Sequence, residues 1–212
     1  YDKGYIFRDN YMVNWDPGSR SAISDLEVEE REVVDQMVEI AYPLASGDGE
    51  VVVATVRPET MLGDTAVAVN PTDERHSHLI GQEVVLPLSG RTVPIIGDEY
   101  VKLDFGTGAL KITPAHDPND FEIGRKHGLE EISVIGEDGR MTQAAGEYAG
   151  LTAAEAKTKV MEDLEAQGFL RKVEDYSHTV PFSHRSGERI EPLISLQWFM
   201  RMDELAKPAI DV

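Results

Sequence analysis

The sequence predicts a mixed but mainly β fold, in which a closed, barrel-like sheet carries a few peripheral α-helices. Short apolar runs rich in valine and isoleucine recur along the chain, separated by glycine, proline or asparagine breaks. Strands of this length and spacing are typical of barrels and closed sheets. Clear helical signals are confined to two segments. The predicted strands are 50–56, 65–69, 83–88, 92–96 and 109–113.

The remaining extended segments are predicted from weaker patterns. Residues 1–28 alternate short apolar runs with turn residues, and the acidic segment 27–39 is expected to be extended. Ser89-Gly90 lies between two apolar runs and predicts a hairpin. Segment 193–202 has strand character.

Each predicted helix has a start signal and a stop signal. Thr152 and Glu155 form a capping box, and Gly168 ends that helix. The other helix is predicted over 118–127, with Asp117 as its N-cap, proline at its first position and glycine directly after it.

Composition narrows the class of protein. The 212 residues are 41% hydrophobic and contain no cysteine, which excludes disulfides and thiolate catalysis and favours a cytoplasmic location. No apolar run approaches the roughly 20 residues of a membrane span, so no membrane partner is expected. The net charge of -19 argues against a general nucleic-acid binder but not against a site that grips one nucleotide end. A start at Tyr1 suggests a piece of a longer protein.

Segment 111–120, KITPAHDPND, concentrates side chains suited to catalysis. A helix start alone explains Asp117 as an N-cap and Asp120 as a first-turn carboxylate at the positive end of the helix. His116 with both aspartates would alternatively suggest a divalent metal site, but Lys111 would oppose a cation and no further ligands are evident. We therefore predict no metal. The segment alone leaves the helix-cap and active-site interpretations open.

Two longer segments resemble one family. Residues 54–71, ATVRPETMLGDTAVAVNP, are similar to the threonine-rich signature of the editing domain inserted in class I aminoacyl-tRNA synthetases, and 106–121, GTGALKITPAHDPNDF, are similar to its second signature. RPET at 57–60 resembles the valyl type, because the isoleucyl type usually has TPWT there. The leucyl type usually lacks the KIT form. IEPL at 190–193 and QWF at 197–199 are similar to the valyl-type return to the catalytic domain.

The resemblance implies how the chain is organised. Residues 1–35 would be a strand-rich connection toward a catalytic domain, 36–175 the editing core and 176–212 the return connection. The family's ATP and adenylate motifs, HxGH and KMSKS, are absent, so neither amino-acid activation nor a cofactor is expected here. Some relatives carry a Cys-x-x-Cys zinc knuckle where this chain has Ser183 and Ser186, and we expect no zinc there.

The resemblance also implies roles for single residues. The catalytic residues would be Lys111, Asp117 and Asp120: Asp120 would pair with the substrate's α-ammonium group, and the other two would read a threonine hydroxyl or hold the reacting group. A lysine near the ester carbonyl can also stabilise a developing oxyanion. Arg57 suits a phosphate, and Phe105 would stack on adenine unless it is a core aromatic. The expected substrate-binding residues are Thr55, Arg57, Thr60, Phe105, Thr113 and His116.

The implied function is editing. Threonine is nearly isosteric with valine, so a valine-shaped apolar pocket rejects it poorly and a second, hydrolytic site is needed. The expected substrate is threonyl-tRNA(Val), hydrolysed after transfer, with hydrolysis before transfer left open. Partners would be the 3′ end of aminoacylated tRNA(Val), the threonyl moiety and the rest of the synthetase in cis. The alternatives are an isoleucyl- or leucyl-type editing domain, a metal-dependent hydrolase, and a binding module without catalysis.

Overall fold

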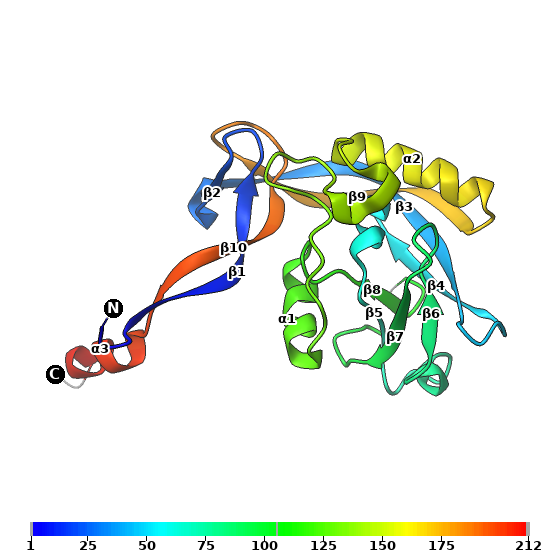
Figure 1. Ribbon diagram of the computed structural model, residues 1–212, viewed down its shortest axis with the longest axis horizontal. Coiled ribbons are helices and arrows are strands. Elements are labelled where there is room, and N and C mark those ends of the chain that lie inside the picture. Colours follow the sequence, from blue (N-terminus) through cyan, green and yellow to red (C-terminus); the bar gives the residue numbers. More distant parts are fainter. Residues whose placement is uncertain (1, 105, 211–212) are drawn as a thin grey trace.

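The computed structural model describes residues 2–104 and 106–210 (Figure 1). These residues form three sheets, accompanied by three α-helices and by short 3-10 helices. The strands are β1 (Ile6–Asp16), β2 (Ser21–Ile23), β3 (Val28–Pro43), β4 (Glu50–Thr55), β5 (Ala66–Val69), β6 (Glu83–Val85), β7 (Thr92–Gly97), β8 (Ala109–Ile112), β9 (Leu170–Ser183) and β10 (Glu191–Met200). The helices are α1 (Pro118–His127), α2 (Ala153–Ala166), α3 (Met202–Ile210) and the 3-10 turns η1 (Asp25–Glu27), η2 (Pro58–Gly63), η3 (Ser77–Leu79) and η4 (Gln143–Tyr148).

The mainly β class is confirmed, but the prediction of a closed barrel is wrong. Within the described residues the sheets have the orders β10-β1-β2, β4-β3-β9 and β6-β7-β5-β8, and none closes on itself. A single bridge, Leu44 to Val84, links β3 with β6 at one side. At the other side β4 and β8 lie near each other without a ladder. At this seam, where a barrel would have backbone pairing, the Lys111 ammonium donates hydrogen bonds to the hydroxyls of Thr60 and Thr113.

Both helix predictions are confirmed. In α1, Asp117 Oδ1 accepts hydrogen bonds from the backbone N–H groups of Asn119 at 2.8 Å and Asp120 at 3.1 Å. Gly128 then ends the helix with a φ of 66°, a left-handed conformation that favours glycine. In α2 the Thr152 capping box is present. The predicted barrel strands all exist, with ends that differ by up to three residues.

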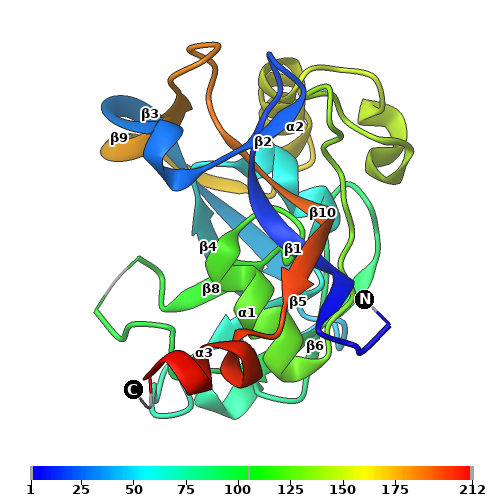
Figure 2. The ribbon, with the colours of Figure 1, turned by 90° about the vertical axis from the view of Figure 1, so that its left-hand side faces the viewer.

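The long antiparallel pair of β3 and β9 was only half predicted. Residues 28–39 of the predicted extended segment 27–39 are confirmed as part of β3, and Glu27 belongs to η1 instead. Strand β9 and helix α3 were not expected. Asp35 pairs with Tyr176 in this ladder. The two predicted boundaries of the editing core, after residues 35 and 175, therefore lie opposite each other on neighbouring strands. Beyond this ladder, β1 and β10 form an arm that projects from the body and ends near both termini (Figures 1 and 2).

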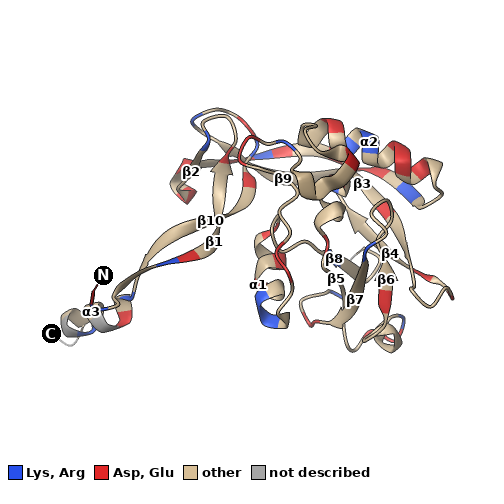
Figure 3. Ribbon diagram, in the orientation of Figure 1, with Lys and Arg blue, Asp and Glu red and all other residues tan. Residues whose placement is uncertain are grey.

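The main apolar core lies between β3, β4, the four-stranded sheet and α2. The buried stripe of α2 packs into this core, as the sequence pattern predicts. Acidic residues are distributed over the arm, the sheets and α2 (Figure 3). None of the helices in the described part of the chain is both long and apolar enough to cross a bilayer. Central core residues are Val38, Ile40, Tyr42, Val53, Val67, Ile95, Ala156, Val160 and Leu164.

Candidate functional site

A small cavity of about 140 Å³ opens at the seam between β4 and β8. Every predicted site residue within the described part of the chain lines it, and Phe105 lies outside the described residues. The two signature segments therefore meet at one place, where Thr60 and Lys111 bond although they lie 51 positions apart in the chain. The lining residues are Ala54, Thr55, Val56, Arg57, Thr60, Leu110, Lys111, Thr113, His116, Asp117 and Asp120.

Lys111 is the centre of a buried polar network. Its Nζ donates to Thr60 Oγ1 at 3.0 Å, Asp64 Oδ1 at 3.1 Å and Thr113 Oγ1 at 2.6 Å. The Thr113 hydroxyl in turn donates to Asp64 Oδ1 at 2.6 Å. A lysine ammonium has three N–H donors, so all of them are used. An oxyanion contact from Lys111 would require that one of these bonds be exchanged.

Asp64 is the residue of this network that the sequence analysis missed. It is fully buried, and the Tyr42 hydroxyl donates to its Oδ2 at 2.7 Å. Burial raises the pKa of Asp64, against the opposing effects of Lys111, Thr113 and Tyr42. Gly63-Asp64 has the local pattern of a turn, and the partners Lys111 and Thr113 are 47 and 49 residues away. Its place inside the signature segment 54–71 is the one signal that could have identified it.

Asp117 and Asp120 form the acidic side of the cavity. The N-cap role of Asp117 is real, and both of its backbone bonds use Oδ1. Asp120 is 7% exposed, and its Oδ2 accepts a hydrogen bond from the Thr113 backbone N–H at 2.9 Å. Burial and the neighbouring Asp117 raise the pKa of Asp120 to about 7. A carboxylate with this pKa gains strongly from a cation placed beside it.

His116 is buried, and its Nε2 is occupied by backbone hydrogen bonds rather than available to a metal ion. Its Nε2 accepts hydrogen bonds from the backbone N–H groups of Val134 at 2.8 Å and Ile135 at 3.3 Å. The ring proton is therefore on Nδ1, which lies 3.4 Å from Glu191 Oε1. Burial lowers the pKa of His116, which favours this neutral form. His116 thus joins segments of the chain together.

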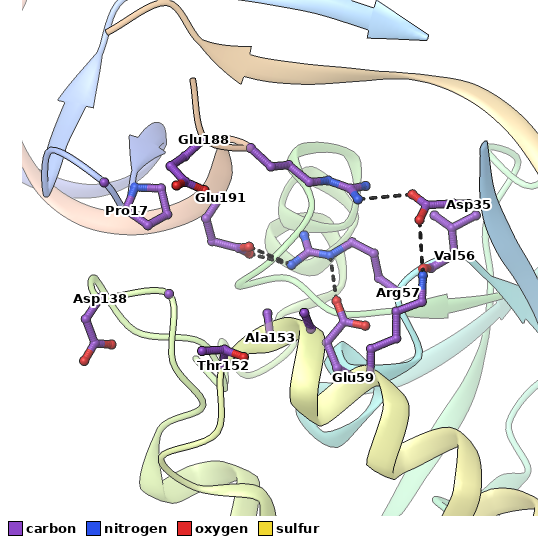
Figure 4. Close-up of a pocket in the computed structure, with 15 residues that line it drawn as sticks. Pro17, Asp35, Val56, Arg57, Glu59, Asp138, Thr152, Ala153, Glu188 and Glu191 are labelled. Carbon is purple, nitrogen blue, oxygen red and sulfur yellow. Dashed lines mark hydrogen bonds and ion pairs between the residues drawn. The ribbon is translucent and has the colours of Figure 1, made fainter. Parts of the chain in front are cut away.

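Arg57 lines both the small cavity and a larger hollow of about 530 Å³, and Figure 4 shows the lining of the larger one. Its Nη2 lies 2.6 and 2.8 Å from the two carboxylate oxygens of Glu191, and its Nε donates to Glu59 at 3.2 Å. Its Nη1 donates to the His116 carbonyl at 3.2 Å. These bonds leave one Nη1 hydrogen for a further acceptor such as a phosphate oxygen.

A second hollow of about 530 Å³ adjoins the small cavity on another side. It shares Ala54 and Leu110 with that cavity, and Met37, Tyr100 and Tyr176 also line it. In residues 2–104 and 106–210, no group of three or more His, Asp or Glu side chains is arranged to hold a metal ion.

Comparison with known proteins identifies the family. The family model of tRNA synthetases class I (I, L, M and V) matches residues 1–212. The chain is 53% identical to the valine–tRNA ligase of Halalkalibacterium halodurans and 52% identical to that of Bacillus subtilis, over 212 residues, which is 100% of this chain and 24% of each relative. It is 55% identical to that of Geobacillus stearothermophilus over 210 residues, 99% of this chain and 24% of the relative.

The chain thus spans about a quarter of the length of the curated relatives it matches. Because the family model covers every residue of the chain, membership does not depend on one motif or one pocket. The chain belongs to the class I tRNA synthetases, and within that family it is a relative of the valine–tRNA ligases.

Proposed function

We propose that this chain is the editing part of a valine–tRNA ligase and that it hydrolyses the ester of threonyl-tRNA(Val). One observation supports this most strongly: a cavity of about 140 Å³ that is lined by both signature segments and has acidic and hydroxyl groups in its wall. Pockets for drug-sized ligands measure roughly 300–1,000 Å³, so a cavity of this size suits one small acyl group.

The polar lining suits a threonyl group. The α-ammonium would pair with Asp120, whose buried carboxylate has few other ways to be stabilised as an anion. The threonine hydroxyl would bond to Asp117 and Thr55, which line the same cavity. A valyl group would leave those polar groups without partners once it excludes water, and that penalty disfavours valine.

The reaction would be direct hydrolysis. A water oxygen attacks the ester carbonyl, the carbon–oxygen bond to the ribose breaks, and the ribose oxygen takes up a proton. Asp117 or the neighbouring ribose hydroxyl would position the water. Lys111 and Asp64 would hold Thr60 and Thr113 in place through the buried network.

The rest of the substrate would lie outside the small cavity. The hollow that shares Ala54 and Leu110 has room for the terminal adenosine of the tRNA, with tyrosine rings for stacking. The free Nη1 hydrogen of Arg57 would meet a phosphate oxygen. The further partners in this proposal are the 3′ end of tRNA(Val) and the remainder of the synthetase in cis, in the cytoplasm.

The test is a panel of aminoacyl-tRNA esters. The chain is used in excess, alone and in place of the matching quarter of the B. subtilis valine–tRNA ligase, so that weak tRNA binding by the chain alone does not hide activity. We expect rapid loss of threonine from tRNA(Val). Preferential hydrolysis of an ester from the isoleucine or leucine system would show a different editing specificity, and binding without turnover would show a docking module.

A further inference from the structure

Glu191 lies behind the proposed site, at the start of β10. It is 8% exposed and does not line the small cavity. It lines the larger hollow on the other side of Arg57, where its carboxylate points toward the guanidinium (Figure 4). Glu191 can therefore affect an acyl group in the small cavity only indirectly, through the residues that it holds in place.

Glu191, Arg57 and His116 form a ring of contacts, two sides of which are hydrogen-bonded. Both oxygens of Glu191 lie within 2.8 Å of Arg57 Nη2, and Arg57 Nη1 donates to the His116 carbonyl at 3.2 Å. His116 Nδ1 lies 3.4 Å from Glu191 Oε1 without a hydrogen bond among the described residues, so the hydrogen-bonded path from Glu191 to His116 runs through Arg57. The members come from three segments: the end of β4, the loop before α1, and β10.

The ring fixes the position of the acidic side of the cavity. His116 directly precedes Asp117, so displacement of the ring also displaces the start of α1. The other face of His116 is held by the Val134 and Ile135 backbone N–H groups. Without the charge of Glu191, Arg57 would keep only Glu59 as an anionic partner, and the guanidinium would be free to swing toward either hollow.

We propose that Glu191 is a positioning residue for threonyl-ester hydrolysis, acting through Arg57 and His116 on the Asp117–Asp120 side of the cavity. This inference rests on the proposed function. A misplacement of about 1 Å at reacting groups costs on the order of a hundredfold in rate. Because Glu191 lies outside the acyl cavity but holds Arg57, its loss should lower kcat by a larger factor than it raises KM.

The experiment is a double-mutant cycle on the full chain, measured with threonyl-tRNA(Val). Glu191→Gln keeps the length of the side chain and removes its charge, and we expect kcat to fall about tenfold to a hundredfold. In an Arg57→Gln background, Glu191→Gln should lower kcat by less than about twofold, because the contact between Arg57 and Glu191 is already lost. Glu188→Gln is the matched control: Glu188 is an exposed carboxylate that lines the same hollow, and this variant should retain wild-type kcat.

The outcomes are distinct. Unimpaired kcat in Glu191→Gln, or an equal loss in both backgrounds, overturns this inference while leaving the proposed function intact. A wild-type chain that hydrolyses no threonyl ester overturns both. If Glu191→Gln does not fold, Glu191→Asp is judged by the same cycle, because it keeps the charge but shortens the reach to Arg57.

Discussion

At the scale of single residues, the buried pair of Lys111 and Asp64 links the site to the stability of the fold. Both are buried and lie 3.1 Å apart. Lys111→Met should leave Asp64 without its cation and destabilise the fold by about 3–5 kcal/mol. Adding Asp64→Asn should recover part of that loss. Urea unfolding of the two variants checks this, and equal stability of Lys111→Met and wild type would contradict the buried network.

Asp120 gives a pH-dependent prediction. Its folded pKa of about 7 lies above the ordinary value of 3.8, so its favourable contribution to stability is complete below about pH 4 and is lost as pH rises through about 7. The upper limit is about 4 kcal/mol, at about 1.4 kcal/mol per pH unit. The neutral Asp120→Asn should therefore gain stability relative to wild type between pH 5 and pH 8.

Thermal melts of both proteins across this range provide the measurement. A difference in melting temperature that does not change with pH would mean that Asp120 does not titrate near neutrality. Asp64 would not confuse the comparison, because it is present in both proteins and keeps its partners.

At the scale of elements, α1 combines a structural and a proposed chemical role at its first turn. Asp117→Asn keeps an acceptor for the Asn119 and Asp120 backbone N–H groups and should change stability little, whereas Asp117→Ala should cost about 1 kcal/mol. Both variants should lose threonine selectivity if the carboxylate reads the hydroxyl. Wild-type selectivity in Asp117→Asn would limit Asp117 to helix capping.

Helices α1 and α2 were predictable because their start and stop signals are local, whereas α3 was not expected. Asp117, Thr152 and Gly128 each act within a few residues, and the structure shows all three in the expected positions. By contrast, β9 carries polar residues on both faces, and its pairing with β3 joins residues more than 120 positions apart, such as Val38 and Val173. No short window of sequence contains that information.

At the scale of the molecule, the site lies where the expected barrel stays open. Repeated short strands predict a sheet, but closure depends on which distant edges pair and on which side chains occupy the seam. The same limit explains the missed members of the site, Asp64 and Glu191, whose partners come from other segments. Both residues lie inside segments that carry the family resemblance, 54–71 and 190–193, but the resemblance implied roles only for residues that line the cavity.

Three serines bonded to the buried Asp16 hold the base of the arm. Asp16 accepts hydrogen bonds from the hydroxyls of Ser19, Ser183 and Ser186, each at 2.7 Å. Burial opposes the charged form, but these bonds outweigh it and hold the pKa of Asp16 well below its ordinary value. Its contribution to stability is therefore present above about pH 4 and lost as pH falls further.

Serine hydroxyls, and not a metal ion, join Asp16 to the segment around Ser183 and Ser186. We therefore predict that chelators change neither the melting temperature nor the hydrolytic rate. Treatment with EDTA followed by elemental analysis and a deacylation assay checks both parts. One tightly bound metal per chain, or activity that disappears with EDTA and returns with zinc, would contradict the prediction.

We propose that the cavity at the β4–β8 seam hydrolyses threonyl esters and that Asp120 holds the substrate's α-ammonium group there. The most direct measurement is the single-turnover rate of deacylation of threonyl-tRNA(Val) and valyl-tRNA(Val) by wild type and Asp120→Asn. Loss of a buried charged contact costs about 2–5 kcal/mol, or roughly thirtyfold to several thousandfold in rate. We predict fast hydrolysis of the threonyl ester by wild type, a sparing of the valyl ester, and a loss of that size in Asp120→Asn with its fold intact. Equal rates on both esters, or full activity in Asp120→Asn, would contradict the account.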